Sequence, residues 1–209
     1  MFDKNNTMVQ GHIVIKDAIT GEVFIDKPNA IHYENMSEAL AQSLGNKSTG
    51  FVTNMVFGNG ATAVDSTGVI TYLPPNTYGQ NASLYSQTYS KIVDDTNVLN
   101  TDPIRNYIEI RHTPGLIYTD VFVTCLLDYA EPSEQRQAGG VIVAGGQQAF
   151  DNSATMQGTF VFDELGLQSN SGKLLTHVIF HPVQKALNRL IQIDYTVRVQ
   201  TLTNLSSNL

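Results

Sequence analysis

The chain has little charge. Asp, Glu, Lys and Arg make up 15% of its 209 residues, whereas about a quarter is usual for globular proteins. The formal net charge is −7, and Lys and Arg do not cluster anywhere along the sequence. Because nucleic-acid binding needs clustered cations to neutralise phosphates, we expect no nucleic-acid partner. Asn, Thr, Ser, Gln and Gly replace the missing charges, which suits a subunit whose outer faces lie against neighbouring proteins.

Paired cysteines and long apolar runs are also missing. Cys125 is the only cysteine, so no internal disulfide can form. It lies in the apolar run 121–127, which is typical of a buried strand, and we predict an inert core thiol. No apolar run approaches the roughly 20 residues of a membrane span, and residues 1–6 lack the apolar core of a signal peptide. We therefore expect a soluble protein, made in a reducing compartment, with no membrane partner.

Cofactor motifs occur only without the context that they need. Residues 58–63 match the Gly-x-Gly-x-x-Ala nucleotide fingerprint, but a strand-like run follows where the pyrophosphate needs a helix N-terminus. We predict a glycine turn between two strands instead. His177 and His181 have the spacing of a helical zinc site. The residues between them favour a strand, in which they would stand about 13 Å apart, so we interpret both as structural.

Two pairs of adjacent carboxylates are the remaining candidates for chemistry. Asp94 is followed by Asp95, and Asp163 by Glu164. Neither pair belongs to a calcium-loop pattern, and adjacent side chains in a strand or turn point apart. We predict that both pairs lie in solvated turns. The sequence therefore indicates no enzyme activity, no cofactor and no metal ion.

Strand-forming residues dominate what is present. Val, Ile, Thr, Tyr and Phe recur throughout the chain. The segment 190–202 alternates apolar and polar residues, which predicts a half-buried antiparallel strand. A hairpin is expected from 12–16 and 22–26, and another long strand within 116–129. Short strands with long connections predict a single-domain, mainly β fold over residues 1–209, an antiparallel β-sandwich.

One short helix is predicted at about 36–44. Asn35 is the expected N-cap, with Glu38 returning a hydrogen bond to the cap, and Gly45 closes the end. The apolar stripe of this helix is expected to consist of Met36, Leu40 and Leu44.

Two long loops, 74–87 and 131–158, are the predicted contact regions. Loops of this length are uncommon in compact domains unless they bind something or reach a neighbour. Lys185 and Arg189 stand in the predicted polar bridge between the last two strands, where they would pair with the acidic patch of a neighbour. The candidate interface residues are Tyr78, Tyr85, Gln147, Gln148, Lys185, Asn188 and Arg189.

Four segments resemble virion structural proteins of tailed bacteriophages. These are 29–40 (NAIHYENMSEAL), 55–60 (MVFGNG), 162–167 (FDELGL) and 172–185 (GKLLTHVIFHPVQK). The same order of parts is loosely similar to the N-terminal domains of phage tail-collar fibre proteins, which attach fibres to the particle. The resemblance implies a non-enzymatic subunit of the virion, assembled in the host cytoplasm. It would be a neck, tail or baseplate ring component, or a capsid decoration protein, and its partners would be copies of itself and other virion proteins.

A binding module is the alternative. A β-sandwich of this kind would recognise a host-surface glycan or anchor a tail fibre. The loop that carries Tyr72, Tyr78 and Tyr85 would supply the aromatic faces that stack on sugars.

Overall fold

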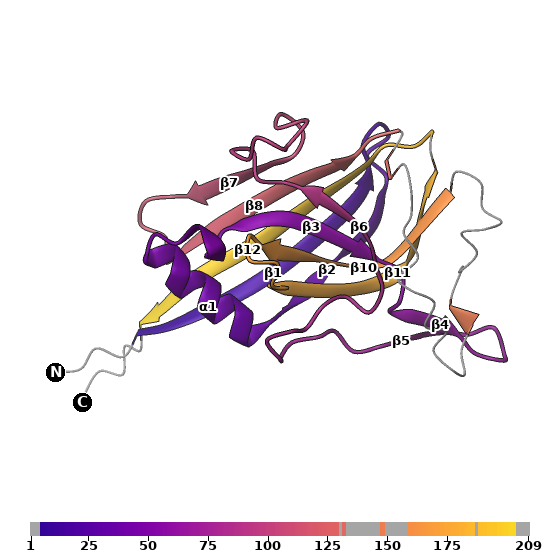
Figure 1. Cartoon of the computed structure of the whole chain (residues 1–209), viewed down its shortest axis with the longest axis horizontal. Coiled ribbons are helices and arrows are strands. Elements are labelled where there is room, and N and C mark those ends of the chain that lie inside the picture. Colours follow the sequence, from indigo (N-terminus) through magenta and orange to yellow (C-terminus); the bar gives the residue numbers. More distant parts are fainter. Residues whose placement is uncertain (1–4, 130, 133–146, 149–158, 187, 204–209) are drawn as a thin grey trace.

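The structure is a computed structural model of the chain, and it describes residues 5–129, 131–132, 147–148, 159–186 and 188–203 (Figure 1). Most of the predicted loop 131–158, including its strand-like part 141–143, lies outside the described residues. The helix and strands are, in order, β1 (Asn5–Asp17), β2 (Val23–Ile31), α1 (Tyr33–Leu44), a 3-10 turn (Ser48–Gly50), β3 (Val52–Gly58), β4 (Thr62–Val64), β5 (Ile70–Tyr72), β6 (Gln87–Ile92), β7 (Tyr107–His112), β8 (Tyr118–Leu127), β9 (Gln147–Gln148), β10 (Thr159–Ser169), β11 (Thr176–Ala186) and β12 (Ile191–Thr203). The predicted mainly β fold with one short helix is confirmed.

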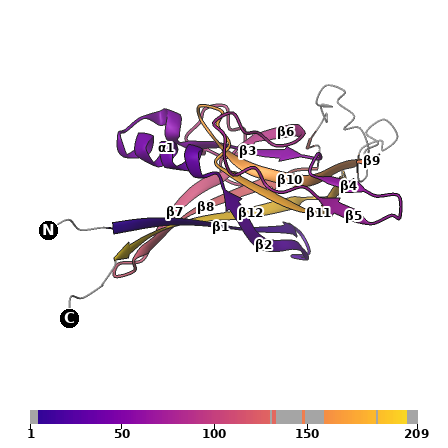
Figure 2. The same cartoon turned by 90° about the horizontal axis from the view of Figure 1, so that it is seen from below.

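One curled antiparallel sheet makes both layers of the fold. Its strand order is β6-β3-β10-β11-β2-β1-β12-β8-β7, and β5, β4 and β9 form a small separate sheet. Between β11 and β2 only two residue pairs connect, Thr176 with Ile31 and His177 with Ala30. The sheet folds over at this narrow junction, so that β6, β3, β10 and β11 face the other five strands (Figure 2). The arrangement is sandwich-like, with two halves of one sheet as its layers.

The pairing of β1 with β12 runs through the middle of one layer. Every residue of β1 has a partner on β12, from Asn5 opposite Thr203 to Asp17 opposite Ile191, without a register shift. The predicted alternation of β12 is confirmed, because its apolar residues from Ile191 to Val197 are buried while those between them are partly exposed. The predicted opening hairpin is also present, since β2 pairs antiparallel with β1.

The core lies between the two layers. Cys125 on β8 is fully buried there, as predicted, and its burial raises the pKa of the thiol to about 12. Other buried members of the core are Ile13, Ile15, Met36, Met55, Phe57, Val123, Phe162, Leu165, Leu167, Phe180, Ile193 and Tyr195.

Helix α1 begins earlier than predicted, because a different residue caps it. The cap is His32, whose Nδ1 accepts the N–H of Asn35 at 3.2 Å. Asn35 itself is buried in the first turn, where its side-chain amide donates to the carbonyl oxygen of Leu174 at 2.9 Å. The prediction of Asn35 as cap is therefore wrong, and Glu38 pairs with Lys173 rather than with the cap. Gly45 ends the helix as expected.

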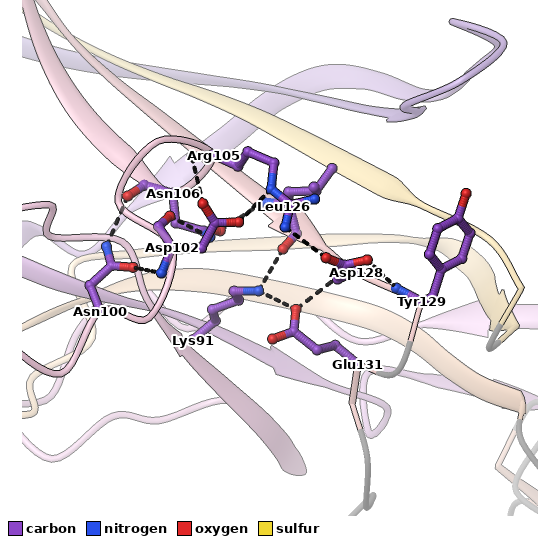
Figure 3. A network of polar contacts seen from close by, with 9 residues as sticks. All are labelled: Lys91, Asn100, Asp102, Arg105, Asn106, Leu126, Asp128, Tyr129 and Glu131. Atoms are coloured by element: carbon purple, nitrogen blue, oxygen red, sulfur yellow. Dashed lines mark hydrogen bonds and ion pairs between the residues drawn. The ribbon is translucent and has the colours of Figure 1, made fainter.

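A lysine ties the two layers together near their open edges. The Nζ of Lys91 on β6 donates to the carbonyl oxygen of Leu126 on β8 at 2.7 Å and pairs with the carboxylate of Glu131 (Figure 3). Glu131 also accepts the N–H of Asp128 at 3.0 Å. Only 10% of the Lys91 side chain is exposed. The ammonium group therefore satisfies a carbonyl and a carboxylate from the other layer at once.

Replacing this lysine tests the tie. We expect Lys91→Met to lower the free energy of unfolding by about 2 kcal/mol or more, because the Leu126 carbonyl and the Glu131 carboxylate lose their partner in a mostly buried position. Lys173→Met is the matched control, because Lys173 is more exposed and pairs only with Glu38, and should cost less than about 1 kcal/mol. Chemical denaturation measures both, and equal losses would contradict the tie.

Candidate functional site

Two adjacent carboxylates are buried in the middle of β10. Asp163 is 1% exposed and Glu164 is 0% exposed. The pairing of β10 with β11 shifts register between Phe162 and Glu164, and such a bulge re-aims the side chains beside it. The prediction that this pair lies in a solvated turn is wrong. Backbone N–H groups from two neighbouring loops take the place of water around both carboxylates.

Glu164 holds the loop between β5 and β6. Its carboxylate accepts the N–H of Tyr85 at 2.9 Å and the N–H of Ser86 at 2.8 Å. It also accepts the N–H of Gly60 at 3.3 Å and faces the Nε2 of His177 at 3.0 Å. Because hydrogen bonds to an ionised group are the strong ones, this single side chain fixes the loop to the sheet.

Asp163 holds the glycine turn between β3 and β4. Its carboxylate accepts the N–H of Ala61 at 3.2 Å and both the N–H and the hydroxyl of Thr62. Burial raises the pKa of Asp163 to about 6, although these donors and the nearby Glu164 act on it as well. The predicted glycine turn is confirmed. A Cβ on Gly58 would stand 2.5 Å from Glu164 Oε1 and from the Ser86 carbonyl oxygen, so this close approach requires glycine.

His177 completes the buried cluster. Its Nδ1 accepts the N–H of Asn76 at 2.8 Å, so this nitrogen carries no proton. Nε2 therefore carries the proton and donates to Glu164. Both ring nitrogens are used, and the interpretation of His177 as a structural histidine is confirmed. His181 is exposed on the same strand, with its Nδ1 3.3 Å from the hydroxyl of Tyr72.

A pocket of about 330 Å³ lies beside this cluster, between β2, β11 and the end of β5. Most of its walls are apolar, and Lys27 spans it by donating to the Ile179 carbonyl oxygen at 2.7 Å. Tyr72 and His181 form part of its polar lining. The buried carboxylates accept hydrogen bonds from N–H and O–H groups of the neighbouring loops, and so they position these loops.

The two predicted tyrosines lie on the loop that Glu164 holds. Tyr85 is 39% exposed, and its hydroxyl donates to the Pro74 carbonyl oxygen at 2.7 Å. Tyr78 is 83% exposed. Gln147 and Gln148 form β9, which pairs with β4, while their side chains lie outside the described residues. An interface role for these residues stays a prediction.

The predicted polar bridge at 185–189 is wrong for its first residue. Lys185 belongs to β11 and is fully buried, because β11 continues to Ala186 opposite β10, and burial lowers the pKa of its ammonium group. Arg189 does lie in the connection, but its guanidinium stacks on Phe24 and donates to Asp17 at 3.1 Å. Its charge is thus paired within the chain, and Asn188 is exposed.

The sequence did not predict the exposed apolar residues in the loop between β6 and β7. In the 93–106 loop, between β6 and β7, Val98 is 96% exposed, Leu99 70% and Ile104 84%. Two asparagines of this loop bond inward: the Asn100 side chain donates to two carbonyl oxygens, and the buried Asn106 accepts the N–H of Leu126 (Figure 3). Apolar residues within an Asn- and Asp-rich segment are the signal that would have found it.

Comparisons with protein-family models, with curated proteins and with solved structures find no match to this chain. Among the residues that the structure describes, no three His, Cys, Asp or Glu side chains gather as a metal-binding group. The described residues also contain no helix of the length and apolarity that a membrane span requires. The exposed apolar residues of the 93–106 loop are the basis for a functional inference.

The raised pKa of Asp163 predicts a pH dependence of stability. The folded state keeps the Asp163 proton up to about pH 6, whereas the unfolded chain releases it near 3.8. The contribution of Asp163 to the free energy of unfolding is therefore fully present below pH 3.8. It is lost as the pH rises to about 6, and the loss is about 3 kcal/mol in all. We expect the stability of the wild type relative to Asp163→Asn to fall by this order between pH 4 and 6.5 in urea denaturation. A difference that is constant with pH would contradict the buried position.

Glu164 should matter far more than an exposed glutamate. In Glu164→Gln the amide group must face at least one of the N–H donors, so we expect a loss of roughly 3 kcal/mol in unfolding free energy. Hydrogen exchange at the Tyr85 and Ser86 amides should become faster. The matched control is Glu109→Gln on β7, whose carboxylate is half exposed and pairs with Arg111, and it should stay within about 1 kcal/mol. Unchanged exchange at Tyr85 and Ser86 would show that another group holds the loop.

Proposed function

We propose that this chain is a non-enzymatic structural subunit that acts by assembling with other protein copies in the virion of a tailed bacteriophage. The 93–106 loop carries the proposal. The side chains of Asn100 and Asn106 form hydrogen bonds within the fold, while the three large apolar side chains of the loop are exposed. Exposed apolar side chains that form a patch on a surface mark interaction sites, and Val98 and Leu99 are neighbours in this loop. The resemblance of the four sequence segments to virion structural proteins is the reason for placing the subunit in a virion.

The energetics favour assembly through this loop. Full burial of a Val, Leu or Ile side chain yields about 1.5–3 kcal/mol. The internal bonds of Asn97, Asn100 and Asp102 already hold the loop, so ordering it on contact costs little further entropy. The low charge density of the chain lowers the desolvation cost of bringing its surfaces together.

A second candidate function is glycan recognition. It is favoured by the exposed Tyr72, which lines the pocket beside His181, and by the highly exposed Tyr78 on the Glu164-bound loop. A ring face of this kind can stack on a sugar. A glycan array probed with the purified chain tests it, and an array without hits removes it.

Polar substitutions in the 93–106 loop test the assembly. We expect the wild-type chain to form multimers in sedimentation velocity, and the double variant Val98→Asn, Leu99→Asn to weaken that contact by tenfold or more, as the loss of two buried apolar side chains implies. Leu44→Asn is the matched control, because Leu44 is 90% exposed at the end of α1, outside this loop. A wild-type chain that sediments as a monomer at all concentrations would overturn self-assembly.

A further inference from the structure

Half of β1 lacks a neighbour on one side. β12 pairs along all of β1, but β2 pairs with it only from Gly11 onward, where Gly11 stands opposite Asn29. Within the described part of the chain, no strand pairs with Asn6 to Gln10 on the side away from β12. This stretch lies beside the end of β12, at the end of the molecule where both termini are drawn (Figures 1 and 2).

The turn after β1 shows which backbone groups face the free side. The N–H of Asp17 donates to Glu22 and its C=O accepts from Gly21, both on the β2 side, whereas the N–H of Ala18 donates to Leu190 on the β12 side. Backbone groups alternate along an antiparallel strand, and the pairing of β1 with β12 has no register shift. Thr7 and Val9 therefore direct their N–H and C=O groups to the free edge.

Among the described residues, this edge carries no protecting feature, unlike two others in the molecule. The edge strand β7 carries Glu109 and Arg111, and β2 has Lys27 and Pro28 in the part that does not pair with β11. Charges and prolines of this kind prevent edge-to-edge pairing. The stretch 6–10 reads Asn-Thr-Met-Val-Gln and contains no charge, proline or glycine.

A groove of about 730 Å³ runs beside the same edge. It is lined on one side by Val9 to His12 and on the other by Pro28 to Ile31 and Tyr33, where β2 leaves β1 and turns into α1. Thr196 and the ion pair of Arg198 with Asp120 complete the lining. Tyr33 is 71% exposed at its border. The groove therefore offers space for the side chains of an added strand next to the free backbone groups.

We propose that a second copy of this chain occupies the edge, with the two β1 strands antiparallel about a two-fold axis beside Met8. Thr7 of each copy then faces Val9 of the other and exchanges both backbone hydrogen bonds with it, while Met8 faces Met8 in a non-hydrogen-bonded pair. This pairing rests on the proposed function, because it names one contact through which copies assemble.

Because residues 6–10 are uncharged, the same strand of a second copy is the favoured partner. In this pairing Asn6 stands opposite Gln10, Thr7 opposite Val9 and Met8 opposite Met8, so no like charges oppose each other. A partner recognised through charge would need complementary charges on this edge, and residues 6–10 have none. The β1 and β12 strands of the two copies join into one continuous sheet.

Charge exchange at Met8 tests the pairing. In the Val98→Asn, Leu99→Asn background, where the other contact is removed, we expect a dimer in sedimentation velocity. Met8→Lys or Met8→Glu alone should weaken the dimer by more than tenfold, because like charges meet on the axis. An equimolar mixture of the two variants should restore it. A monomeric background chain, or a mixture that remains monomeric while both variants unfold at the wild-type temperature, overturns the pairing.

Disulfide trapping tests the register. Cys125 is fully buried, so Met8→Cys supplies the accessible thiol, and directly opposed residues of a non-hydrogen-bonded pair lie within disulfide reach. We expect Met8→Cys to cross-link on oxidation and Gln192→Cys, on β12, not to. No cross-link through Met8→Cys overturns the pairing. If the wild type still forms multimers that depend on Val98 and Leu99, the proposed function stands without it, whereas a wild type that is always monomeric contradicts both.

Discussion

Two carboxylates buried away from solvent are the constraint on which the arrangement of β10 and its two neighbouring loops depends. Because Asp163 and Glu164 are buried in β10, each must find donors inside the molecule. The donors are backbone N–H groups of two separate connections, so both loops are drawn onto the sheet. The glycine at position 58 and the tautomer of His177 follow from the same requirement, since one allows the close approach and the other supplies a donor.

The alternation of apolar and polar residues and the residues typical of turns predicted the parts of the fold that depend on local sequence. The alternation of β12, the opening hairpin and the glycine turn at 58–60 were all readable, because each pattern lies within a short segment. Asp163 and Glu164 were misread because adjacent charges within an apolar run favour a turn unless distant donors compensate them. Those donors include Tyr85 and Ser86, which are 79 and 78 positions away, and no local pattern shows the contact.

The wrong predictions for Lys185 and for the helix N-cap have the same physical origin. A lysine near a chain connection is normally solvated, yet Lys185 is buried because β11 keeps pairing with β10 through Ala186. Asn35 is a better capping residue than His32 by propensity, but its amide satisfies the Leu174 carbonyl oxygen across the core. In both cases a tertiary contact outweighed a local preference.

The two proposed contact surfaces differ in symmetry, and this bears on the assembly that they would build. Pairing of β1 with its own copy is isologous, so it closes on itself and yields only a pair. A head-to-tail contact through the 93–106 loop would use a different surface on the partner, and repeated rotation would close it into a ring. Combined, the two proposed contacts would place rings back to back in dihedral symmetry. A ring component of a neck or tail is compatible with that geometry, and the unprotected β1 edge would then lie between the rings.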